Sequence, residues 1–169
     1  MKQGNIKKQD KVLTYLSFLL DDEYFAVDVT KVLTILEIKP ITKVPNSPEY
    51  MSGVINLRGN VLPVIDMRIK FGMTPIVFTK NTCIVVLSVN IEDEPVQLGI
   101  LVDAIDRVTE IKEKEIEPVP TIGTKYKTEF IHGLYKLKDG FILLLDINLI
   151  FNSDTKIISK DTEIKPIVS

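Results

Sequence analysis

The sequence is almost without cysteine and histidine. Cys83 and His132 are the only residues of their types among 169. One cysteine excludes an internal disulfide framework and a thiolate metal cluster, and one histidine excludes a histidine-rich metal site within one chain. The polar N-terminus, MKQGNIKKQDK, also lacks the apolar core of a signal peptide. We therefore expect a cytoplasmic protein that holds no metal and no cofactor.

Long apolar runs and an excess of positive charge are also missing. No apolar run exceeds about five residues, whereas a membrane-spanning helix needs roughly 20. The formal net charge is -2 at pH 7, and a protein that binds phosphate backbones would be basic. Neither G-x-x-x-x-G-K-[ST] nor G-x-G-x-x-G is present to cradle a nucleotide phosphate. These absences argue against membrane insertion, nucleic-acid binding and nucleotide binding.

Alanine is scarce as well, and its scarcity indicates the fold class. The chain has two alanines, against 23 isoleucines and 17 valines. Side chains that branch at Cβ suit pleated strands, whereas alanine is the best helix former. The sequence therefore predicts a mainly β protein whose short strands are separated by turn residues. The expected strands cover residues 15–20, 24–28, 33–38, 54–57, 61–65, 83–89, 96–102, 108–111, 133–137 and 141–145.

The chain contains an internal repeat. The stretch YMSGVINLRGNVLPVIDMRIKF, which begins at Tyr50, matches FIHGLYKLKDGFILLLDINLIF, which begins at Phe130, at a constant offset of 80. Earlier in each half, FAVDVTKVLTILEI matches LGILVDAIDRVTEI at an offset of 73. The shared spacing of glycine, aspartate and apolar residues favours duplication over chance similarity between two β sequences.

The repeat suggests how the domain is organised. A half of about 70 residues has a marginal core on its own, so we expect two small five-stranded barrels packed on a shared core. The domain would cover residues 14–152, with approximate halves at 14–73 and 82–152. Residues 1–13 would form an N-terminal tail and residues 153–169 a C-terminal segment. The sequence leaves open whether each strand stays with its own half.

Candidate catalytic residues are few. Asp66 and Asp146 occupy equivalent places in the repeat, and a converging carboxylate pair would suit a hydrolase that uses general acid–base catalysis. Each aspartate also follows an apolar strand and precedes a short helix-like segment, which is the position of an N-cap. The capping interpretation is favoured. We expect Cys83 to be a small buried hydrophobe, and His132 to be structural or exposed to solvent.

Arg58 is the most informative polar residue. In the stretch NLRGN it would lie at the tip or shoulder of a tight hairpin. There its guanidinium is free to bind a carboxylate of a partner, or is an ordinary solvated arginine. The middle loop of each half is rich in proline, which stiffens the backbone and pre-shapes the loop. Such a loop serves as a simple connection or as a binding surface, and the sequence leaves both possibilities open.

A resemblance to a known family narrows these alternatives. The stretch GVINLRGNVLPVIDMRIKFG at 53–72 closely resembles the signature of the bacterial chemotaxis coupling protein family CheW. The stretch YLSFLLDDEYFAVDVTKV at 15–32 has the same family's pattern, and LGILVDAIDRV at 98–108 resembles its counterpart in the second half. The same module occurs in the kinase CheA and the adaptor CheV. This chain has room for neither a kinase nor a receiver domain, which indicates a free-standing coupling protein.

The resemblance implies two SH3-like five-stranded β-barrels and a non-enzymatic adaptor. Such proteins couple the cytoplasmic tips of methyl-accepting chemotaxis receptors to the C-terminal regulatory domain of the histidine kinase CheA, in arrays at the inner membrane. The receptor-binding positions that it implies are Val32, Thr34, Ile35, Arg58 and Val108. The kinase-binding positions that it implies are Ile41, Thr42, Lys43 and Val44, with a second contact at Glu117 and Ile122.

Two positions depart from the family pattern. Thr34 stands where many relatives have an acidic residue, and Glu117 stands where a relative has a basic one. One hypothesis is that the chain serves a specialised receptor or a second, paralogous signalling cluster, with a second kinase contact that is weaker or differently paired. The alternative function is a small-ligand sensor that uses the groove which Val32, Ile35 and Val108 would line between the barrels. A closed cavity would favour the sensor, whereas an open groove sized for a helix would favour the adaptor.

Overall fold

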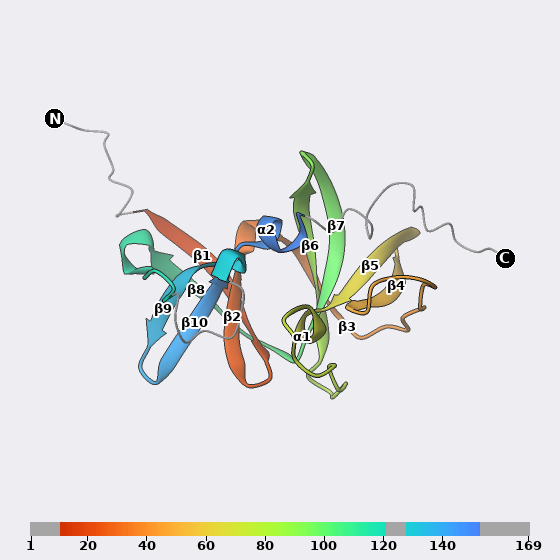
Figure 1. Ribbon diagram of the computed structural model, residues 1–169, viewed down its shortest axis with the longest axis horizontal. Coiled ribbons are helices and arrows are strands. Elements are labelled where there is room, and N and C mark those ends of the chain that lie inside the picture. The colour runs from red at the N-terminus through yellow and green to blue at the C-terminus, as the bar shows by residue number, and fades with distance from the viewer. Residues whose placement is uncertain (1–10, 121–127, 153–169) are drawn as a thin grey trace.

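The computed structural model describes residues 11–120 and 128–152, which form ten strands and a few short helices (Figure 1). The strands are β1 (Val12–Leu20), β2 (Glu23–Asp28), β3 (Val32–Glu37), β4 (Met51–Leu57), β5 (Asn60–Asp66), β6 (Cys83–Ile91), β7 (Glu94–Val102), β8 (Ala104–Lys112), β9 (Ile131–Leu137) and β10 (Gly140–Leu145). The α-helices are α1 (Met67–Lys70) and α2 (Ile147–Phe151). The 3-10 turns are η2 (Val29–Lys31), η3 (Glu113–Glu115) and η4 (Thr128–Phe130).

The strands form two five-stranded sheets of the same topology. Sheet A has the order β8-β1-β2-β10-β9, and sheet B has the order β3-β6-β7-β5-β4. If five is added to each strand number of sheet B, with the count returning to β1 after β10, the strand order becomes that of sheet A. Each sheet also contains one parallel pair, β2 with β10 and β5 with β7, at equivalent places. The expected mainly β fold of two similar units is confirmed.

The two sheets do not coincide with the two halves of the sequence. Sheet B is one continuous stretch from β3 to β7, whereas sheet A joins β1 and β2 to β8, β9 and β10. The chain crosses between the sheets twice, at η2 and at Asp103, the single residue between β7 and β8. The question that the sequence left open is thereby answered, because strands of each half take part in both sheets.

One isolated bridge links the opposite edges of each sheet. In sheet B, Thr42 exchanges two backbone hydrogen bonds with Val54 of β4, at 2.9 and 2.8 Å. In sheet A, Glu117 exchanges two with Leu134 of β9, both at 2.8 Å. Each bridge joins the segment that follows one edge strand to the other edge strand. Both sheets are therefore curled, with a single backbone pair across the opening.

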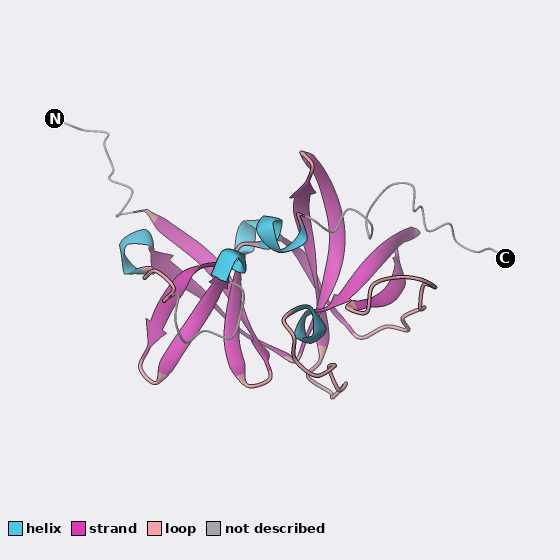
Figure 2. Cartoon of the chain, viewed as in Figure 1, coloured by secondary structure: helices cyan, strands magenta, loops and turns pink. Residues whose placement is uncertain are grey.

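Three apolar clusters stabilise this arrangement. The largest lies between the sheets and contains Phe18 and Phe25 of sheet A, Val85 and Ile100 of sheet B, and Phe151 of α2. The ring centroids of Phe18 and Phe25 are 6.3 Å apart in a stacked arrangement. A smaller cluster belongs to sheet B and another to sheet A. Figure 2 shows helical turns lying between the two groups of strands, where α2 and α1 close the shared core.

Gly53 is required by the bridge in sheet B. Its φ is +148°, and a Cβ at this position would collide with the carbonyl group of Thr42. We expect Gly53→Ala to lower the free energy of unfolding by about 3 kcal/mol, because the backbone at Gly53 or at Thr42 must move to make room for the Cβ. Urea denaturation measures this loss.

Gly59 provides the matched control. Its φ is +84°, but a Cβ there would meet no atom within 4 Å. Gly59→Ala should therefore lower the free energy of unfolding by only about 1 kcal/mol, which is the strain of a positive φ at alanine. Equal losses for the two variants would contradict the close approach at Gly53.

Candidate interaction surfaces

Arg58 lies where the sequence predicted, at the tip of a tight hairpin. Arg58 and Gly59 connect β4 to β5 with φ values of +54° and +84°. Two positive φ values in a two-residue loop match the twist of the flanking strands. The Asn56 Oδ1 atom accepts the Gly59 N–H at 3.0 Å, which fixes the turn. The Arg58 side chain is exposed and forms no hydrogen bond or ion pair with a described residue, so its donors face solvent.

Val32, Thr34 and Ile35 lie together on β3, an edge strand of sheet B. They pair with Leu87, Val86 and Val85 of β6, and the register shifts between Val32 and Thr34. A bulge of this kind re-aims side chains. Here it leaves Leu33, Thr34 and Ile35 exposed in succession, with Leu33 48% and Ile35 43% accessible. Leu33 was not among the predicted positions. Its exposure together with that of Thr34 reflects the bulge, since an alternating strand turns successive residues to opposite faces.

Val108 lies apart from that group, on β8 of sheet A. It pairs with Leu16 of β1 and is 58% exposed. The offset of 73 makes Val108 the counterpart of Ile35, and both lie on the edge strand that follows a crossing between the sheets. The structure therefore places four of the five positions that the resemblance implies for receptor binding in sheet B, and the fifth at the equivalent edge of sheet A.

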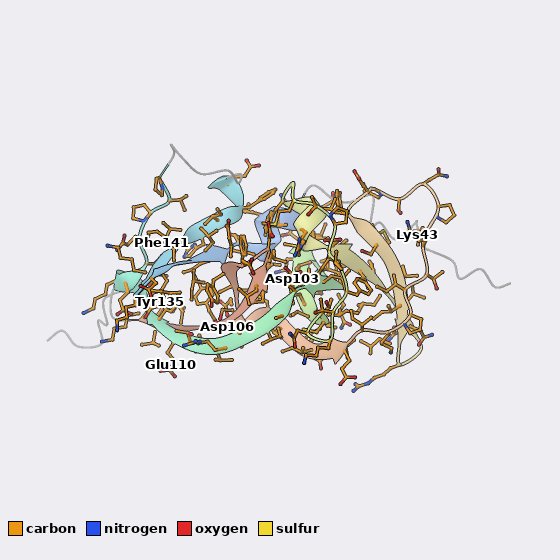
Figure 3. The ribbon with its side chains drawn as sticks, turned by 90° about the horizontal axis from the view of Figure 1, so that it is seen from below. Lys43, Asp103, Asp106, Glu110, Tyr135 and Phe141 are labelled. Atoms are coloured by element: carbon orange, nitrogen blue, oxygen red, sulfur yellow. The ribbon has the colours of Figure 1, made fainter. Side chains whose placement is uncertain are left out.

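An ion pair fixes the start of β8. The Arg68 guanidinium of α1 donates to Asp103 from Nη2 at 2.7 Å and from Nε at 3.1 Å. The Asp103 carboxylate also accepts the Asp21 N–H at 2.6 Å, which links it to the β1–β2 turn. Hydrogen bonding to Asp103 raises the pKa of Arg68, so the guanidinium stays charged. Figure 3 shows Asp103 at the centre of the molecule, with Asp106 and Glu110 farther along β8.

The Arg68–Asp103 pair gives a stability prediction. Both side chains are mostly buried, at 16% and 20% exposure, so a loss of the pair leaves a poorly solvated carboxylate. We expect Arg68→Gln to lower the free energy of unfolding by about 2 kcal/mol in urea denaturation. The control is Arg107→Gln, since Arg107 is 69% exposed and lies 3.4 Å from Asp106. That change should cost less than about 0.5 kcal/mol, and equal effects would contradict a structural role for Arg68.

The loop after β3 carries the four implied kinase-binding positions. Thr42 is fixed by its bridge to Val54, Ile41 packs against the sheet B cluster, and Val44 packs against the shared core. The Ser47 hydroxyl donates to the Val44 carbonyl at 2.7 Å and closes the loop locally. Thr42 and Lys43 remain exposed. Figure 3 places Lys43 at the opposite end of the molecule from Tyr135 and Phe141.

The second implied kinase contact is only partly described. Glu117 bridges Leu134 through its backbone, and its carboxylate lies 3.8 Å from the Lys136 ammonium. Both side chains are largely exposed, so this pair contributes little stability. Ile122 lies outside the described residues.

The capping interpretation of the two aspartates is confirmed. Asp66 caps α1 by accepting the backbone N–H groups of Arg68 at 2.9 Å and Ile69 at 3.3 Å. Asp146 caps α2 by accepting the Leu149 N–H at 3.1 Å. The two carboxylates belong to different sheets and are occupied by their own helices. They do not form the converging pair that a hydrolase would need.

Cys83 and His132 are the remaining candidate side chains. Cys83 is half-buried rather than buried, and burial raises the pKa of its thiol. His132 is exposed to solvent, which is one of the two environments predicted for it. Within residues 11–120 and 128–152, no three histidine, cysteine or acidic side chains group together as metal ligands would. No helix in the same ranges is long and apolar enough to cross a membrane.

Two hollows mark the described surface. One, of about 300 Å³, includes Tyr15, Glu113 and His132 in its lining. Burial and the neighbouring carboxylates raise the pKa of Tyr15 to about 12, so its hydroxyl stays protonated at neutral pH. The other, of about 700 Å³, lies beside the loop that contains Ile41 and Lys43. Neither hollow is lined by Val32, Thr34, Ile35 or Val108.

Comparison with known proteins identifies the family. The family model described as the CheW-like domain matches residues 14–155. The chain belongs to the CheW-like family. Chemotaxis protein CheW of Klebsiella aerogenes is 31% identical over 140 residues, which are 83% of this chain and 82% of that protein. Chemotaxis protein CheW of Helicobacter pylori is 33% identical over 86% of this chain and 85% of that protein.

A solved structure agrees with the CheW-like assignment. The scaffolding protein TtCheW from Thermoanaerobacter tengcongensis matches with a TM-score of 0.76 and 28% identity, over 94% of this chain and 97% of that one. The resemblance read from the sequence is therefore confirmed. This CheW-like chain is a non-enzymatic adaptor of chemotaxis signalling.

Proposed function

We propose that this chain couples methyl-accepting chemotaxis receptors to the histidine kinase CheA, in cytoplasmic arrays at the inner membrane. The observation that carries the proposal is Arg58. Its charged group extends from a rigid hairpin without a described partner, in the same sheet as an edge strand that exposes apolar side chains. An exposed arginine without an ion pair, in the same sheet as exposed apolar residues, is typical of a protein-binding surface.

The receptor face consists of Val32, Thr34 and Ile35 on β3, with Arg58 and Val108 as further contacts. Leu33 and Ile35 offer apolar area, and Arg58 offers bidentate hydrogen bonds to a carboxylate. The Lys39 ammonium donates to the Asn56 carbonyl at 2.9 Å, which ties the segment after β3 to the Arg58 hairpin. This combination suits an amphipathic receptor helix whose apolar stripe is flanked by an acidic residue.

The kinase face consists of Ile41, Thr42, Lys43 and Val44, with Glu117 and Ile122 as the second contact. The C-terminal regulatory domain of CheA is its proposed partner. Thr42 and Glu117 each form the isolated bridge of their sheet, so the two contacts would use equivalent parts of the duplicated fold. Since the loop is held at Thr42 and Val44, little backbone entropy is lost when it binds.

The two departures from the family pattern fit a specialised adaptor. Thr34 is exposed and uncharged on the bulged part of β3, so the receptor segment opposite it needs no cation. Glu117 lies near Lys136 within its own sheet, so a kinase residue that meets Glu117 would also meet that ammonium group. Both features favour a receptor and kinase pair that is matched to this chain.

Arg58→Ala tests the receptor face. We expect the substitution to weaken binding of a receptor cytoplasmic fragment about tenfold, because a charged hydrogen-bonding anchor is removed. Affinity for CheA and the melting temperature should not change, since the Arg58 side chain has no contact within the described fold that would be lost. Calorimetric titration and thermal denaturation measure these quantities.

The matched control is Lys138→Ala. Lys138 is the counterpart of Arg58 at the offset of 80 and is exposed at the β9–β10 turn. Its loss should leave receptor binding unchanged. A large drop in melting temperature for Arg58→Ala, or equal weakening by both variants, would count against Arg58 as a specific anchor.

A further inference from the structure

We propose that residues 75–78, between the two repeats, form the second wall of the kinase-binding groove and that Phe78 anchors CheA there. The inference rests on the proposed kinase role of the loop Ile41–Val44 and extends it to a segment that neither the repeat nor the family resemblance singled out. The segment follows α1 and precedes β6.

The hollow of about 700 Å³ has two walls that are distant in sequence. Ile41 and Lys43 contribute to one wall, and Ile76 and Phe78 contribute to the other. Ile69 of α1 also lines the hollow. A partner that contacts the loop Ile41–Val44 on this side would therefore meet Phe78 as well.

The segment that forms the second wall exposes two adjacent apolar residues. Phe78 lines the hollow and is 50% exposed, and Val77, between the lining residues Ile76 and Phe78, is 72% exposed. Adjacent exposed apolar residues that border a hollow are typical of a protein-binding site, and aromatic side chains often carry most of the binding energy. Ile76, in contrast, packs against the sheet B cluster, so the segment is attached to the core directly beside the two exposed residues.

Hydrogen bonds hold the exposed pair on both sides. On the N-terminal side of Val77 and Phe78, the Ile76 N–H donates to the second carboxylate oxygen of Asp66 at 3.1 Å. Asp66, which caps α1, therefore also fixes this wall. On the C-terminal side, the Thr79 N–H donates to the Thr82 hydroxyl at 2.8 Å, and the Thr82 N–H returns to the Thr79 carbonyl at 3.2 Å. Thr82 is buried. Val77 and Phe78 are thus presented by an ordered backbone, which reduces the entropy lost on binding.

The charges around the hollow specify the partner's chemistry. Lys39 and Lys43 lie on the loop wall, and Lys43 is exposed without a described ion pair. Asp66 also lines the hollow, but its carboxylate accepts backbone N–H groups and is almost inaccessible. Glu49 is the one exposed acid in the lining. The groove therefore fits a CheA segment that inserts an apolar side chain beside Phe78 and places a carboxylate opposite Lys43.

Phe78→Ala in the full chain tests the inference by calorimetric titration with full-length CheA. We expect CheA to bind at least about tenfold more weakly, with the melting temperature and receptor binding unchanged. Leu149→Ala is the matched control, because Leu149 is 49% exposed but lies on α2, outside the hollow and outside both proposed kinase contacts. It should bind CheA as the unsubstituted protein does. Val77→Asp places a carboxylate directly beside Phe78 at the edge of the hollow, and it is the second variant if Phe78→Ala lowers the melting temperature.

The outcomes separate this inference from the proposed function. If the unsubstituted chain binds CheA and both Phe78→Ala and Val77→Asp bind equally well, the second wall is wrong while the adaptor role stands. If the unsubstituted chain binds no CheA, the adaptor role fails and the groove loses its assigned partner. A concentration-dependent dimer in sedimentation velocity that Phe78→Ala abolishes would also overturn the inference, in favour of a second copy of this chain.

Discussion

The shared apolar core between the sheets is the constraint on which the rest of the structure depends. Phe18 and Phe25 of sheet A pack in the same cluster as Val85 and Ile100 of sheet B, and all four are buried. Each sheet also has a cluster of its own, but those clusters are smaller. Sheet A is assembled from both ends of the described chain around a continuous sheet B, so sheet A requires both ends of the chain to come together. Because the largest cluster is shared by the two sheets, we expect the duplicated sequence to fold as one unit.

This constraint also positions the interaction surfaces. The chain leaves sheet A through η2 and enters β3 at Val32, and it leaves sheet B at Asp103 and enters β8. Both edge strands with exposed apolar residues therefore begin directly at a crossing, and Arg68 holds one crossing in place. The loop Ile41–Val44 lies beyond the far end of β3, against sheet B. The proposed receptor positions on β3 and β8 thus lie near the crossings, and the proposed kinase-binding loop lies away from them.

Much of the fold was predictable because its signals are local. The scarcity of alanine and the turn residues between short apolar runs indicated a β protein. The constant offsets of the repeat indicated two similar units. The Arg58-Gly59 turn and the capping roles of Asp66 and Asp146 depend on neighbouring residues, and they were confirmed. Strand exchange was not predictable, since the pairing of β2 with β10 joins residues more than a hundred positions apart and leaves the repeat pattern unchanged. The exposure of Leu33 depends on a bulge, and the Arg68–Asp103 pair and the ordered display of Phe78 depend on tertiary contacts.

The separation of the two faces is most directly tested by sedimentation velocity of a soluble receptor cytoplasmic fragment mixed with CheA, with and without this chain. If the faces are separate, the chain will bring receptor and kinase into one faster-sedimenting complex that contains all three proteins, and omitting the chain will remove that complex. If the receptor fragment instead displaces CheA from the chain, the two partners share one surface, and the chain is not an adaptor with two faces.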